Sequence, residues 1–163
     1  MPPEAAPRVW QALLAPRSIA VIGASAGAGI PALPLRFLRK HGFPGRLYPV
    51  NPRYTEMEGL PCYPDVAALP EAPDLAMVMV AAARVPAAVE ACGAAGVPFA
   101  IICGSGFAET GAAGEAAQRE VAVLAERHGV GLLGPNCQGL MNVPGRVFAG
   151  FSSAFNSERF AAG

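Results

Sequence analysis

Residues 19–25 read Ile-Ala-Val-Ile-Gly-Ala-Ser, a short apolar run that stops at Gly23. Gly27 and Gly29 follow before an apolar, helix-like stretch begins near Pro31. This order is typical of a buried parallel strand, a glycine-rich turn and a helix whose N-terminus faces a ligand. The unpaired amides of such an N-terminus attract phosphate, and glycine lets the backbone come close to it. The stretch predicts a nucleotide-type cofactor domain, with a tight turn that holds no ligand as the alternative.

Composition limits the class of protein. The chain has 163 residues, enough for one domain with a sizeable core, and its 53% apolar and 15% charged residues exclude a disordered chain. The formal net charge is zero with no evident basic face, so nucleic acid is not an expected partner. The longest apolar run, residues 75–83, is far shorter than the roughly 20 residues of a membrane span. The N-terminus does not resemble a signal peptide, and we expect a cytoplasmic protein.

The cysteines and histidines do not suggest a metal site or a catalytic centre. Four cysteines lie far apart with no CxxC pair, which argues against a zinc site. Cys137 is a conceivable nucleophile, but no basic residue is close to it in the sequence, and an inert thiol is the favoured interpretation. His41 and His128 each precede a glycine at the expected end of a helix. We therefore assign no catalytic residue and no metal ligand.

Strand-like and helix-like runs alternate along the chain. The apolar runs expected as strands are residues 18–23, 46–50, 74–80, 98–103 and 131–133, and the helix-like runs are 31–41, 65–68, 85–95 and 114–128. The strands lack polar alternation, as expected where helices cover both faces of a parallel sheet. The pattern predicts an α/β fold: a Rossmann-like, doubly wound parallel sheet of about five strands in a single domain over residues 1–142. Residues 143–163 show no clear period and are expected to form a C-terminal arm or linker.

The end of the second strand distinguishes between cofactors. An NAD domain usually carries Asp or Glu there to hold the ribose hydroxyls, whereas this chain has Asn51, Pro52 and Arg53. A cation at this place favours an extra phosphate on the ribose, as in NADP or coenzyme A (CoA), and a solvated surface charge is the alternative. The other strand ends carry small or polar residues, including Val80, Cys103 and Asn136, and these leave room for a ligand.

Five segments together resemble one family. They are Ile-Gly-Ala-Ser at 22–25, Tyr-Pro-Val-Asn-Pro-Arg at 48–53, Gly-Leu-Pro-Cys-Tyr-Pro at 59–64, Gly-Phe-Ala-Glu-Thr-Gly at 106–111 and Leu-Gly-Pro-Asn-Cys-Gln-Gly at 133–139. In this order and spacing they are similar to the CoA-binding domain of ADP-forming acyl-CoA synthetases. That family includes acetate–CoA ligase (ADP-forming) and is related to the alpha subunit of succinyl-CoA synthetase. The resemblance covers residues 17–142 and implies a Rossmann-like fold.

The resemblance also implies which residues contact CoA. The pyrophosphate would meet the glycine turn, at Gly23, Ala24, Ser25 and Gly27. Arg53, where the family often has Lys, would meet the phosphorylated ribose, with Asn51 beside it in the same site. Val80 would flank the adenine, while Cys103, Gly104 and Ser105 would line the pantetheine path and Asn136 its thiol end. The family commonly has Pro where this chain has Ala81, which alters that wall of the site.

In the resembled family the reaction is acyl-CoA + ADP + phosphate ⇌ carboxylate + CoA + ATP, through an acyl phosphate and a phosphohistidine. The histidine lies in a following ligase-CoA domain, and ATP, ADP and Mg²⁺ belong to an ATP-grasp domain. This chain ends at Gly163, where the second domain would begin, so its expected partners are those domains, in the same or another chain. Two alternatives remain: a free-standing CoA-binding or sensing protein, and an NADP-binding domain. A fused acetyltransferase and a homo-oligomer are also open.

Overall fold

The protein is described from a computed structural model that covers residues 6–158. Five strands form one sheet in the order β2-β1-β5-β6-β7, and every neighbouring pair is parallel. Their bounds are β1 Ser18–Ile22, β2 Arg46–Val50, β5 Leu75–Val78, β6 Phe99–Ile102 and β7 Gly131–Leu133. Each of the five predicted strands is present within two residues of its expected ends. The predicted Rossmann-like sheet is confirmed.

The strand order places a ligand crevice between β1 and β5. From β1 the chain crosses to β2 on one side of the sheet, and then to β5 on the other side. Helices leave opposite faces at such a reversal, so a gap opens outside the carboxyl ends of the two strands. Gly23 follows β1 and Met79 follows β5, and the Met79 amide donates to the carbonyl of Ile22 across this edge. The glycine turn therefore lies at the topological switch point.

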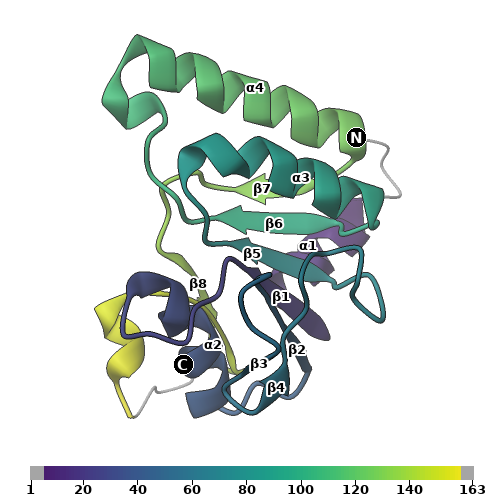
Figure 1. Cartoon of the computed structure of the whole chain (residues 1–163), viewed down its shortest axis with the longest axis vertical. Helices are drawn as coiled ribbons and strands as arrows, with labels where there is room; N and C mark the ends of the chain where they lie inside the picture. Colours follow the sequence, from purple (N-terminus) through teal and green to yellow (C-terminus); the bar gives the residue numbers. More distant parts are fainter. Residues whose placement is uncertain (1–5, 159–163) are drawn as a thin grey trace.

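Helices cover both faces of the sheet (Figure 1). The helices are α1 Ala6–Leu14, α2 Leu33–Lys40, α3 Val85–Ala94 and α4 Ala112–His128. Helices α1 and α2 pack on one face, and α3 and α4 on the other. Short 3-10 turns precede α2, α3 and α4 at Ile30–Ala32, Ala82–Arg84 and Ala108–Thr110. No helix within residues 6–158 combines the length and apolar character that a bilayer crossing requires.

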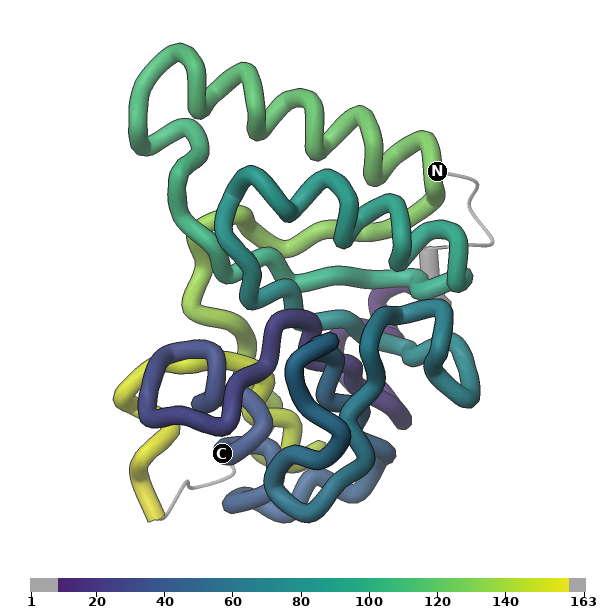
Figure 2. Tube along the Cα trace, viewed as in Figure 1, coloured from purple at the N-terminus to yellow at the C-terminus, as the bar shows by residue number. Residues whose placement is uncertain are grey.

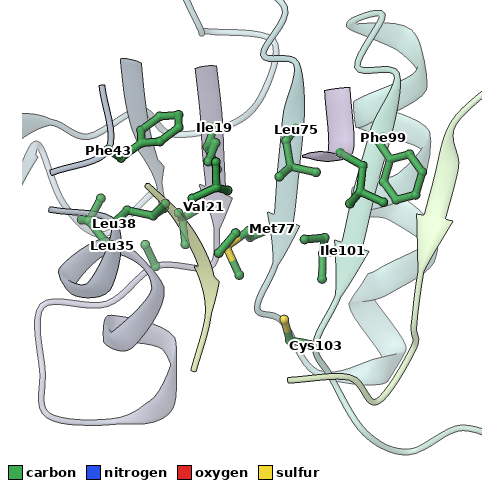
Figure 3. Packing of buried hydrophobic residues seen from close by; sticks show 14 of the residues in the cluster. Ile19, Val21, Leu35, Leu38, Phe43, Leu75, Met77, Phe99, Ile101 and Cys103 are labelled. Carbon is green, nitrogen blue, oxygen red and sulfur yellow. The ribbon is translucent and has the colours of Figure 1, made fainter. Parts of the chain in front are cut away.

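Alternate residues of the strands fill two separate cores. In β1, Ile19 and Val21 point to the α1–α2 face, whereas Ala20 and Ile22 point to the α3–α4 face. Figure 3 shows the first core, where side chains of β1, β5 and β6 form a row beside those of α2. All five β1 residues are buried. This two-sided burial explains why the strands read as continuous apolar runs.

Three parts of the fold differ from the sequence expectations. The helix expected at residues 65–68 is a turn, in which the Asp65 carboxylate accepts a 2.9 Å hydrogen bond from the Ala68 amide. Pro64 and Pro70 enclose a segment that is too short to nucleate a helix. Helix α1 was not predicted. Two small antiparallel hairpins, β3 Glu56–Met57 with β4 Leu60–Pro61 and β8 Gly139–Asn142 with β9 Val147–Gly150, were not predicted either.

The segment after Asn142 packs against α2. Strand β9 is fully buried, and a 3-10 turn at Ser153–Asn156 follows it. Phe148 and Phe155 are buried against Phe37 of α2, with ring centroids of Phe37 and Phe155 5.7 Å apart. Figure 2 shows this yellow segment beside the blue-violet trace of α2. The sequence of this expected C-terminal arm shows no helical or alternating apolar pattern because all four residues of β9 are buried. The domain boundary at residue 142 stays a prediction.

Candidate functional site

A cavity with a volume of about 560 Å³ opens at the predicted crevice. Its walls come from the ends of β1, β2 and β5, from the turn at residues 64–66 and from the first turns of α3. Apolar side chains dominate the α3 side, and polar ones lie at the β2 end. This volume and mixture are those of a small-molecule site. Of the residues predicted to bind a cofactor, the cavity is lined by Gly23, Ser25, Asn51, Arg53 and Val80.

The glycine turn is held close to the end of β5. Gly23 has a φ of +83°, and a Cβ built on it would lie 2.8 Å from Cγ1 of Val80. Ala24 is fully buried beneath the turn and does not line the cavity. Gly27 is exposed, has nothing within 4 Å of a built Cβ and does not line the cavity. The turn thus presents Gly23 and Ser25 to the crevice, and Gly27 lies further out.

Asn51 joins the second strand to this turn. Its side-chain Nδ2 donates a 2.8 Å hydrogen bond to the carbonyl oxygen of Ala24, and its Oδ1 accepts a 3.0 Å bond from the amide of Arg53. One amide side chain therefore fixes the backbone on both sides of the crevice mouth. The guanidinium of Arg53 is exposed, and no carboxylate pairs with it among the described residues. It is available to an anionic ligand.

A second arginine, which sequence reasoning missed, lines the same cavity. Arg84 precedes α3 and is exposed, and within residues 6–158 it also has no carboxylate partner. The cavity thus has two unpaired cations, against one carboxylate, Asp65, which already caps the Ala68 amide. Arg84 lies four residues beyond Val80 in a 3-10 turn, and no local pattern in the sequence distinguishes it from a surface charge.

A smaller cavity of about 250 Å³ continues from the first. Pro31, Met79 and Val80 line both cavities, so the two meet at the switch point. The smaller one is lined by all four residues predicted for the pantetheine end: Cys103, Gly104, Ser105 and Asn136. It also includes Ile30 and Phe151, which sequence reasoning did not assign to the site. Together the cavities form one elongated path with cations at one end.

The inner end of this path is built by two strand-end loops that hold each other. The amide of Asn136 donates a 3.0 Å hydrogen bond to the carbonyl of Gly104. Asn136 has a φ of +54°, a conformation that asparagine tolerates better than most residues. A Cβ built on Gly104 would lie 2.7 Å from the Val80 carbonyl oxygen, so glycine lets the loops after β5 and β6 come together. The loops after β5, β6 and β7 thus line this end of the path together.

Two thiols lie in contact behind this end. Hydrogen bonding from the Cys103 thiol lowers the pKa of the Cys137 thiol below its ordinary value, against the opposing effect of burial. The same contact, together with burial, raises the pKa of Cys103. Cys137 is half-buried and Cys103 is buried. The sequence placed both residues at strand ends but gave no sign that they touch.

Both histidines lie outside the crevice. His41 follows α2, stacks on Phe148 with ring centroids 3.8 Å apart, and its Nε2 lies 2.8 Å from the carbonyl oxygen of Phe155. His128 ends α4, where its side chain faces Gly93. Both positions agree with the predicted helix ends. Among residues 6–158, no group of three His, Cys, Asp or Glu side chains is arranged to hold a metal ion.

Comparison with known proteins identifies close relatives. Residues 17–143 match a family described as the CoA binding domain. The chain is 45% identical over 141 residues to the ADP-forming acetate–CoA ligase I of Archaeoglobus fulgidus, covering 86% of this chain and 20% of that protein. It is 36% identical over 146 residues to the alpha subunit of the ADP-forming acetate–CoA ligase I of Pyrococcus furiosus, covering 86% and 32%.

A solved structure has the same fold. The apo form of the dinucleotide forming acetyl-coenzyme A synthetase 1 of Candidatus Korarchaeum cryptofilum superposes with a TM-score of 0.83 at 39% identity. The match covers 86% of this chain and 31% of that one. This chain therefore spans between about a fifth and a third of the length of these relatives.

Proposed function

The chain belongs to the CoA-binding domain family, and from this we propose that it forms the CoA site of an ADP-forming acyl-CoA synthetase. The relatives named as ADP-forming acetate–CoA ligases support the reaction class. Within such an enzyme the domain holds CoA while the conversion of acyl-CoA to carboxylate and CoA is coupled to the formation of ATP from ADP and phosphate, and the reverse reaction consumes ATP. The ligase-CoA and ATP-grasp domains of the same or a partner chain supply the remaining chemistry.

The observation that carries the proposal is the pair of adjoining cavities with cations in one of them. CoA is a phosphorylated nucleotide joined to a long, narrow pantetheine arm. The larger cavity, with Arg53 and Arg84, suits the nucleotide and its phosphates, and the smaller one, which includes Cys103 and Asn136, suits the arm. NADP carries a second nucleoside in place of that arm. The match of residues 17–143 to a CoA binding domain family favours the arm over that second nucleoside.

The assignment of individual residues follows this orientation. Gly23 and Ser25 offer the turn to the diphosphate, while Ala24 and Asn51 keep the turn in place. Arg53 meets the ribose 3′-phosphate at the crevice mouth. Val80 lies where the two cavities join, between the adenine and the arm.

Isothermal titration calorimetry tests the proposal directly. The chain is titrated in turn with CoA, dephospho-CoA, NADP and NAD at one ionic strength. We expect CoA to bind most tightly, because only it combines the 3′-phosphate with the pantetheine arm. Micromolar binding of NAD without any response to CoA would overturn the assignment.

A further inference from the structure

The thiol pair at the end of the path has chemistry that CoA binding does not use. Cys103 directly follows β6, and its side chain lies at the end of the row of core side chains in Figure 3. Cys137 lies in the loop after β7 and packs against that core. The Asn136–Gly104 hydrogen bond fixes the two loops together beside the thiols. The contact is therefore part of the fold, although 34 positions separate Cys103 and Cys137.

The two thiols differ in their surroundings. Cys137 is half-buried, and its sulfur lies near the amides of Cys137 and Gly139 as well as the Cys103 thiol, all of which favour the thiolate. The carbonyls of Ile102 and Leu133, at 3.6 and 3.8 Å, accept its proton in the neutral form. Cys103 is buried against the core. A half-buried thiol whose surroundings favour the thiolate thus lies beside a second, buried thiol, and the first is the better nucleophile.

We propose that Cys103 and Cys137 form a redox-active dithiol that reduces hydroperoxides and closes to an intramolecular disulfide beside the smaller cavity. In the first step the Cys137 thiolate attacks one peroxide oxygen. An S–O bond forms and the O–O bond breaks, and the leaving alkoxide or hydroxide takes a proton to give an alcohol or water. Cys137 becomes a sulfenic acid, and the peroxide gains two electrons.

In the second step the Cys103 sulfur attacks the sulfenic sulfur of Cys137. An S–S bond forms, the S–O bond breaks, and the departing hydroxide takes the Cys103 proton to leave as water. The contact that holds the proton on Cys103 is lost once Cys137 is no longer a thiolate, so its attack becomes easier as the first step finishes. The two residues pack in one core cluster, and the sulfurs approach to the bond length of about 2.05 Å as the bridge closes.

The test oxidises the reduced chain with one equivalent of hydrogen peroxide. Thiol titration should fall from the four free cysteines to two, and the intact mass should fall by two hydrogens. Cys92 and Cys103 share one tryptic peptide because Arg84 and Arg119 are its nearest flanking basic residues. Peptide mapping is therefore done on the Cys92→Ser variant, in which a bridge from that peptide to the Cys137 peptide must come from Cys103.

Two further variants separate the steps. Cys103→Ser should stop at the Cys137 sulfenic acid, which dimedone traps, and Cys137→Ser should lose the fast reaction. Cys62→Ser is the matched control and should form the bridge at the rate of the unchanged chain. A bridge to another cysteine, or oxidation of Cys103→Ser without a dimedone adduct on Cys137, would overturn the proposal. CoA is absent throughout, so the result does not depend on the proposed function.

Discussion

The side-chain amide of Asn51 donates a 2.8 Å hydrogen bond to the carbonyl oxygen of Ala24, which ties the end of β2 to the turn after β1. The same side chain accepts a bond from the Arg53 amide. Asn51 thus orients both the turn proposed for the diphosphate and the backbone of the arginine proposed for the ribose phosphate. Its main role is to position these groups, although it also lines the cavity.

Asn51→Asp should weaken both stability and CoA binding. The carboxylate keeps an acceptor for the Arg53 amide but cannot donate to Ala24, and it places negative charge beside a carbonyl oxygen and the CoA phosphates. Losing such a partly buried hydrogen bond costs about 1–3 kcal/mol. Urea unfolding measures stability and calorimetry measures affinity. Gln11→Glu makes the same chemical change at an exposed position of α1, and it should alter neither the stability nor the affinity for CoA. Equal effects of both variants would contradict the argument.

Arg53→Ala should weaken CoA far more than dephospho-CoA. Only CoA carries the ribose 3′-phosphate, and a charge-assisted contact contributes about 1.5–3 kcal/mol, or roughly 10- to 100-fold in affinity. Titration of the variant with both ligands measures the difference. Arg127→Ala, on α4 and outside both cavities, is the control and should bind both ligands as the unchanged chain does. Equal losses for the two ligands would place Arg53 away from the 3′-phosphate.

Arg84→Ala should weaken CoA and dephospho-CoA by the same factor, roughly tenfold or about 1.4 kcal/mol. With Arg53 assigned to the 3′-phosphate, the anion left for Arg84 is the diphosphate, which both ligands share. Calorimetry at two salt concentrations checks the electrostatic origin, since the loss should shrink at high ionic strength. A selective loss of CoA alone would exchange the roles of the two arginines.

The sequence was sufficient to predict the strands and the site residues that directly follow them, but it did not reveal the contacts between distant segments. The apolar runs of β1 and β2 and the residues that follow them, Gly23 and Arg53, were readable because they obey local rules. The assignment of Asn136 to the thiol end came from the resemblance and is still a prediction. Arg84 was missed because an exposed arginine before a helix has no local signature. The Cys103–Cys137 contact depends on how two distant loops pack.

Gly23→Ala should destabilise the fold where Gly27→Ala does not. A Cβ at Gly23 would lie 2.8 Å from Val80 Cγ1 and 3.1 Å from the Met79 oxygen, at a φ of +83° that disfavours alanine. Overpacking of this kind costs about 1–3 kcal/mol. A Cβ at Gly27 meets nothing within 4 Å at an ordinary φ. Urea midpoints of the two variants measure the contrast, and equal midpoints would mean that the turn relaxes around the new methyl group.

The isolated chain should have no synthetase activity. The proposed relay needs a histidine that receives phosphate, but His41 is stacked on Phe148 and His128 ends α4 away from the crevice. It also needs a nucleotide site, and the glycine turn is already assigned to CoA. Incubation with labelled ATP, acetate, Mg²⁺ and CoA should give neither acetyl-CoA nor an acid-labile phosphoprotein. Either product would show that this chain is catalytically complete. Activity that returns only when ligase-CoA and ATP-grasp domains are added would support its place as their CoA site.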